Sequence, residues 1–141
     1  MAATRTANAQ WQGALADGKG SVSLDSSGVA RFDVTWASRA EDPNGRTSPE
    51  ELIAAAHSSC FSMALSKQLG DAGTPPDSLD TKAEVTLEPG KGITGIHLAV
   101  RGNVPGTSAG DFASAAENAK NGCPVSQALA GTTITLDAQL T

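Results

Sequence analysis

The feature that most constrains this chain is a clear signal for a helix that begins after Ser48. Ser48 suits the N-cap, Pro49 suits the first helical position, and Glu51 stands where a capping box requires an acid. The helix should continue to about Leu69, where glycines follow. Apart from His57, residues 54–60 have small side chains, so another backbone can approach this part of the helix closely.

Patterns of alternating apolar and polar residues predict strands on both sides of this helix. The segment 37–47 is polar and is expected to be a loop. We expect strands at residues 10–13, 21–24, 29–36, 81–87, 93–104 and 132–140, and further helices at 109–120 and 123–130. Runs of strands separated from helices indicate an α+β fold, and 141 residues fit one domain.

Charge and hydropathy exclude several classes of function. The net charge of -5 argues against a nucleic-acid or anionic-membrane surface. No apolar run approaches the ~20 residues that a membrane span needs, and the polar start does not resemble a signal peptide. The expected location is therefore the cytoplasm, where a cysteine pair is usually catalytic or redox-sensing.

The chain contains two cysteines, and both stand beside helix signals. Cys60 lies inside the long helix, where a thiol is commonly a small buried hydrophobe. Cys123 precedes Pro124 at an expected helix start, a turn that should be exposed. There, unpaired backbone N–H groups would favour its thiolate. The two together suggest a redox pair, and the absence of Cys-x-x-Cys disfavours a thioredoxin-type exchanger.

Two other uses of these residues stay open at this stage. His57, Cys60, His97 and Cys123 are the right types for a zinc site, but finger-type spacing is missing. A Cys-His pair for acyl transfer could use His97 as its base, although no local signature supports it. His57 itself is better explained as a packed or hydrogen-bonded helix residue.

A peroxide-reducing thiol would need a cation to lower its pKa, and Arg39 is a candidate because its guanidinium stays charged. Glu50 is a free carboxylate that could hold Arg39 in place. On chemistry alone, however, Arg39 is better explained as a solvated loop charge and Glu50 as an acid favoured by the helix dipole.

Two cysteine motifs carry a family resemblance. Residues 48–66, read as SPEELIAAAHSSCFSMALS, and residues 122–127, read as GCPVSQ, resemble the signatures of the OsmC/Ohr family of thiol-dependent peroxidases. Trp11-x-Gly13, residues 18–20 and Ser38-Arg39-x-Glu41 are similar to its OsmC branch. The resemblance covers nearly the whole chain in order.

The resemblance implies an OsmC-like α+β domain over residues 1–141, with antiparallel sheets packed on the long helix and an intertwined homodimer. It implies reduction of organic hydroperoxides and hydrogen peroxide, with Cys60 peroxidatic, Cys123 resolving, and Arg39 and Glu50 assisting. Ala40 departs from the aromatic residue often found there, so Arg46 is the alternative cation. An external thiol or dithiol would reduce the disulfide, and no metal or other cofactor is required. The competing interpretation is a non-enzymatic redox-sensing or thiol-containing binding domain on the same fold.

Helix geometry adds one expectation about the assembly. Glu50 and Cys60 are ten residues apart on one expected helix, which separates them by about 15 Å along its axis. An Arg39 clamped by Glu50 would then reach the Cys60 of another chain more readily than its own.

Overall fold

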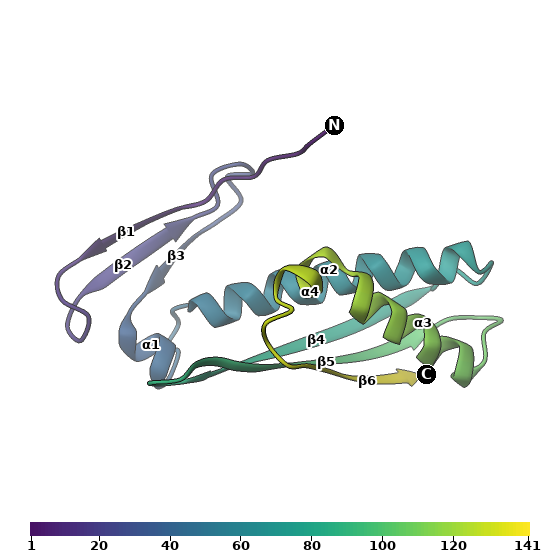
Figure 1. The fold of residues 1–141 in the computed structure, drawn as a ribbon. Coiled ribbons are helices and arrows are strands. Elements are labelled where there is room, and N and C mark those ends of the chain that lie inside the picture. Colours follow the sequence, from purple (N-terminus) through teal and green to yellow (C-terminus); the bar gives the residue numbers. More distant parts are fainter. The chain divides into compact units, whose positions relative to one another are not determined.

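The computed structural model describes residues 1–141, and their contacts form two compact units, Met1–Leu52 and Ile53–Thr141. Figure 1 shows strands and helices in separate runs, which confirms the expected α+β class. The elements in order are β1 (Asn8–Gln12), β2 (Lys19–Ser23), β3 (Arg31–Val34), α1 (Trp36–Ala40), α2 (Pro49–Asp71), β4 (Ser78–Glu88), β5 (Gly92–Asn103), α3 (Ala109–Gly122), α4 (Pro124–Ala128) and β6 (Ile134–Leu140).

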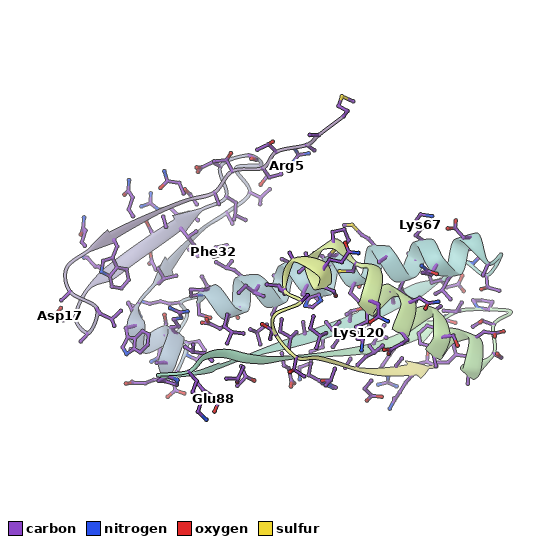
Figure 2. All side chains as sticks on the ribbon, in the orientation of Figure 1. Arg5, Asp17, Phe32, Lys67, Glu88 and Lys120 are labelled. Carbon is purple, nitrogen blue, oxygen red and sulfur yellow. The ribbon has the colours of Figure 1, made fainter.

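The N-terminal unit contains a three-stranded antiparallel sheet in the order β1-β2-β3. Trp11 pairs with Gly20, where a Cβ atom would come within 2.7 Å of the Trp11 ring, so this position requires glycine. Both faces are largely exposed in the single chain, and Phe32, labelled on β3 in Figure 2, is 36% exposed. The strand expected at 29–36 is shorter, Arg31–Val34, and three of its four residues are exposed.

A short helix, α1, replaces part of the loop expected at 37–47. Thr35 is its N-cap, and the hydroxyls of Thr35 and Ser38 accept hydrogen bonds from each other's backbone N–H in a capping box. This cap also ends β3 at Val34 and places Trp36 in the helix rather than in the strand. The Ser38 hydroxyl donates to the Thr47 carbonyl at 3.0 Å, which ties α1 to the residue before Ser48, the N-cap of α2.

The start of α2 follows the sequence signal in part. Ser48 Oγ accepts a hydrogen bond from the Glu51 N–H at 3.1 Å, as the N-cap prediction requires. The Glu51 carboxylate does not complete a capping box; it accepts from Thr47 Oγ1 at 2.6 Å. The Glu51 carboxylate is thus bound to Thr47, and the Glu50 carboxylate remains available for a different partner.

The C-terminal unit packs helices on one sheet, in the order β4-β5-β6, as Figure 1 shows. β4 and β5 form an antiparallel hairpin, but β6 runs parallel to β5. The expectation of purely antiparallel sheets was wrong here, since α3 and α4 connect β5 to β6 and return the chain in the same direction.

The core of this unit lies between the helices and the sheet. It contains Phe61 and Leu65 of α2, Leu98 of β5, and Phe112 and Ala116 of α3, each at most 1% exposed. The apolar residues of α2 thus face the sheet one helical turn apart, which fixes the rotation of the helix and hence the direction of the residues between them. None of the helices combines the length and apolar character needed to cross a lipid bilayer.

Candidate thiol site

The two cysteines meet at the junction of α2 and α4. Cys60 lies in the middle of α2, and Cys123 is the N-cap of α4, with Pro124 at the first helical position. Their Sγ atoms are 3.1 Å apart. Cys60 is partly exposed, whereas Cys123 is 0% exposed. Cys123 is confirmed at the start of a helix; Gly122 and Pro124 beside it are exposed, as expected of this turn, but the Cys123 side chain itself is buried.

The two thiols have opposite electrostatic surroundings. Burial raises the pKa of Cys60, and its hydrogen bond with Cys123 raises it further, while the Val125 N–H lowers it. Burial would also raise the pKa of Cys123, but hydrogen bonds from Ser126, Cys60 and Val125 together lower it below its ordinary value. Within this unit, the surroundings therefore favour a thiolate at Cys123 over one at Cys60. A Cys60 thiolate requires an additional positive charge.

A second bridge joins the same two helices beside the thiols. His57 is fully buried, and its Nε2 lies 2.7 Å from Ser126 Oγ. The Ser126 N–H donates to Cys123 Sγ at 3.5 Å. The description of His57 as a packed, hydrogen-bonded helix residue is confirmed. Sequence reasoning did not single out Ser126, although its place three residues after an N-cap was a usable signal.

Arg39 and Glu50 form the other close pair among the expected site residues, within the N-terminal unit. Arg39 Nε and Nη2 donate to the Glu50 carboxylate at 2.9–3.2 Å in a two-pronged ion pair. Glu50 is 6% exposed and the Arg39 side chain 34%. The hydrogen bond with Glu50 raises the pKa of Arg39, so the guanidinium stays charged. Its Nη1 donates no hydrogen bond within the chain, so this group can donate to a further anionic partner.

The remaining candidates occupy other surroundings. Arg46 is exposed and makes no ion pair. The His97 ring on β5 is exposed and bonds Thr135 Oγ1 at 2.6 Å through Nδ1. No three His, Cys, Asp or Glu side chains gather in a metal-binding group, so the zinc arrangement considered above has no geometric support.

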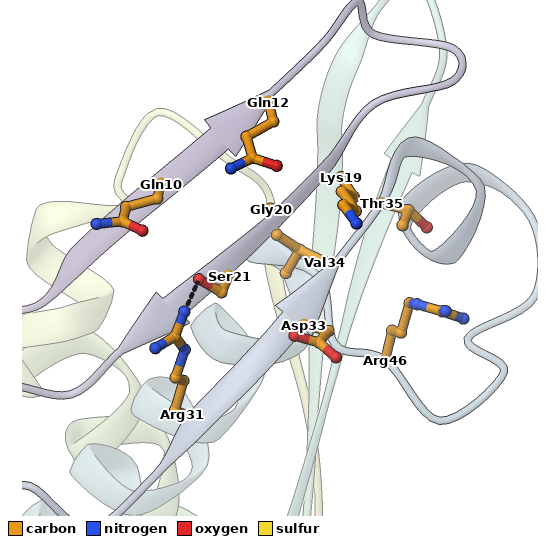
Figure 3. A pocket seen from close by; sticks show the side chains of 10 residues that line it. All are labelled: Gln10, Gln12, Lys19, Gly20, Ser21, Arg31, Asp33, Val34, Thr35 and Arg46. Atoms are coloured by element: carbon orange, nitrogen blue, oxygen red, sulfur yellow. Dashed lines mark hydrogen bonds between the residues drawn. The ribbon is translucent and has the colours of Figure 1, made fainter.

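A hollow of the N-terminal unit contains neither cysteine. It measures about 390 Å³ and lies over the sheet, and Figure 3 shows Gln10, Lys19, Arg31, Asp33 and Arg46 around it. Arg31 bonds Ser21 Oγ at 2.9 Å. Its lining is mostly polar and holds no cysteine, histidine or buried acid, so we assign no chemistry to it.

Together, the α+β fold and the touching thiols define a protein with a paired-cysteine redox site. A partly exposed thiol beside a buried one can be oxidised from solvent and then form a disulfide with its neighbour. Neither thiol needs to travel far, because the two sulfur atoms are already in hydrogen-bond contact.

Comparisons with known proteins identify the family. The model of the OsmC-like protein family matches residues 42–137. The chain is 46% identical over 143 residues to peroxiredoxin OsmC of Escherichia coli strain K12, covering 99% of each chain. Peroxiredoxin OsmC of Shigella flexneri matches to the same extent. The chain belongs to the OsmC family, as the two cysteine motifs indicated.

Solved structures agree on the fold. The OsmC-like protein of Mycoplasma pneumoniae superposes with a TM-score of 0.76 at 13% identity, covering 100% of this chain and 99% of that one. The organic hydroperoxide resistance protein of Elizabethkingia anophelis gives 0.66 at 27% identity, with the same coverage. The OsmC-like fold expected from the sequence is thus confirmed.

Proposed function

We propose that this chain is a thiol-dependent peroxidase that reduces organic hydroperoxides and hydrogen peroxide, with Cys60 as the attacking thiolate and Cys123 as its resolving partner. The observation that carries the proposal is the contact between a partly exposed and a fully buried thiol, 3.1 Å apart. The names of the relatives support the substrate class: one is a peroxiredoxin and another an organic hydroperoxide resistance protein.

Exposure supports the division of roles between the thiols. A hydroperoxide from solvent can approach Cys60, whereas Cys123 is closed off until Cys60 reacts. The Cys60 thiolate attacks the distal peroxide oxygen, the O–O bond breaks, and alcohol or water leaves. The Cys60 sulfenic acid then condenses with Cys123 to a disulfide with loss of water. An external thiol or dithiol restores both thiols through a mixed disulfide.

The cation for Cys60 is proposed to be Arg39, held by Glu50. Burial raises the pKa of Cys60, so an opposing charge within about 4–6 Å is needed to favour its thiolate. Arg39 suits this role because Glu50 fixes its orientation while Nη1 stays free. The exposed Arg46 has no such support, which favours Arg39 of the two.

We further propose that Arg39 and Glu50 act on the Cys60 of a second copy in a twofold homodimer. Glu50 and Cys60 belong to the same uninterrupted helix, α2, and are ten residues apart. An Arg39 side chain held by Glu50 therefore cannot easily reach Cys60 of its own chain. Exposed small residues on α2, at Ala55 and Ala56, leave a surface that another helix can approach closely. The exposed sheet β1-β2-β3 also leaves apolar side chains for a partner to cover.

The cytoplasm is the proposed location, because the reaction requires a reducing supply of thiols.

The decisive experiment measures turnover. Cumene hydroperoxide, tert-butyl hydroperoxide and hydrogen peroxide are each supplied with a dithiol or a monothiol, and the peroxide remaining is followed. Many turnovers per chain are expected. Consumption of only one equivalent would instead identify a redox sensor that is oxidised once.

Variants of the two cysteines test the assigned roles. Cys60→Ser should consume no peroxide, whereas Cys123→Ser should react once and accumulate a sulfenic acid that dimedone traps. Intact-mass measurement after one equivalent of peroxide distinguishes the products. Equal loss of the first reaction in both variants would contradict the assignment.

A further inference from the structure

His57 is a fully buried ionisable side chain that the proposed reaction leaves unused. It is 0% exposed, and its Nδ1 has no hydrogen-bond partner. A buried polar atom without a partner is costly, and an apolar side chain at this point of the core would avoid the cost. The bond from Nε2 to Ser126 Oγ is the one polar contact that the ring makes.

The unpaired Nδ1 indicates which of the two ring nitrogens carries the hydrogen. Burial lowers the pKa of His57, so the ring is neutral and carries one N–H. A hydrogen on Nδ1 would be a buried donor without an acceptor, which folded proteins rarely contain. The hydrogen therefore lies on Nε2 and is donated to Ser126 Oγ at 2.7 Å.

This donation leaves the Ser126 hydroxyl hydrogen free for another acceptor, and Cys123 Sγ is adjacent. The Ser126 N–H already donates to that sulfur at 3.5 Å, and the Ser126 side chain also lowers the pKa of Cys123. His57 precedes Cys60 by about one turn of α2, and Ser126 follows Cys123 by about one turn of α4. The two bridges between the helices therefore lie side by side.

We propose that His57 is a positioning residue for the resolving step, acting through Ser126 to aim hydrogen-bond donors at the Cys123 sulfur. This inference rests on the proposed function. The Cys123 thiolate attacks the sulfenic sulfur of Cys60, the S–S bond forms as the S–O bond breaks, and the oxygen leaves as water after taking a proton. Cys123 is oxidised and the sulfenic sulfur is reduced. Donors from Ser126 lower the pKa of Cys123 and so favour the thiolate that makes this attack.

The role predicts a separation of two rates. Attack of Cys60 on peroxide does not use Cys123 as nucleophile, and the contact with Cys123 raises the pKa of Cys60, so disturbing the relay should not slow that step. Disulfide formation should slow, and the sulfenic acid should persist. A purely structural role would disturb both steps, because His57 and Cys60 are neighbours on the same helix.

The test compares variants of both relay residues in the full chain by rapid mixing with one equivalent of cumene hydroperoxide. His57→Leu removes the Nε2 donor and Ser126→Ala removes the hydroxyl donor while keeping the Ser126 backbone N–H, whereas His57→Gln supplies an amide N–H. We expect disulfide formation to slow about tenfold in the first two, the size of a lost hydrogen bond to a charged group, and to recover in His57→Gln. The yield of dimedone-trapped sulfenic acid should rise in parallel. In a Cys123→Ser background, His57→Leu should not change the rate of Cys60 oxidation.

Several results would overturn the inference. Unchanged disulfide formation in both loss variants, or equal slowing of Cys60 oxidation and disulfide formation, would remove the relay role. Failure of His57→Gln to restore the rate would show that packing, not donation, is what His57 supplies. If His57→Leu does not fold, Ser126→Ala alone carries the test. A wild-type chain that forms no disulfide would instead refute the proposed function, so the two failures are distinguishable.

Discussion

Oxidation of the thiol pair should stabilise the protein against unfolding. The cysteines are 63 positions apart, and a cross-link over a loop of this length lowers the entropy of the unfolded chain by an amount equivalent to about 4 kcal/mol. The native state should lose little of this to strain, because the sulfur atoms already lie 3.1 Å apart. At roughly 2–4 °C per kcal/mol for a protein of this size, Tm should rise by about 10 °C.

The assay is thermal unfolding followed by circular dichroism, before and after one equivalent of hydroperoxide, with excess peroxide removed. Cys123→Ser is the matched control, because it can be oxidised but cannot close the loop. Its Tm should change by much less than that of the wild type. An oxidised wild type with a complete disulfide and no higher Tm would refute the reasoning. It would mean that the disulfide forms only after the α2–α4 junction rearranges.

Three further predictions concern other parts of the structure. Arg39→Ala should slow alkylation of Cys60 by iodoacetamide at neutral pH, whereas Arg46→Ala should not; the reverse result would move the cation role to Arg46. Co-refolding equal amounts of inactive Cys60→Ser and Glu50→Ala should restore about a quarter of wild-type activity if the residues act between copies. Half of the randomly formed dimers are then mixed, and each mixed dimer has one intact site of two. No recovery of activity would place the site within one chain. Burial lowers the pKa of His57 from 6.5, so the unfolded chain binds a proton that the folded one does not; stability should fall as pH drops below 6.5, and His57→Leu should reduce that slope in urea unfolding.

Much of the local structure could be predicted from neighbouring residues. The cap at Ser48, the helix carrying Cys60 and the N-cap at Cys123 all depend on hydrogen bonds within a few positions of the chain. The short helix α1 was missed, although its Thr35-x-x-Ser38 cap is equally local. The parallel pairing of β6 could not be found this way, because alternation of side chains does not reveal which direction a strand runs beside its neighbour.

The same distinction between local sequence and tertiary packing applies to the thiol site. By itself, the sequence determined the residue types: two thiols beside helix signals, an arginine before the long helix and an acid in its first turn. The tertiary structure decided which of them meet. The packing of α4 against α2 brings Cys123 within 3.1 Å of Cys60 and buries it, and it adds Ser126 and His57 beside them. Burial and hydrogen bonding then give the two thiols opposite pKa shifts, an effect that depends on distances in space and not on separation along the chain.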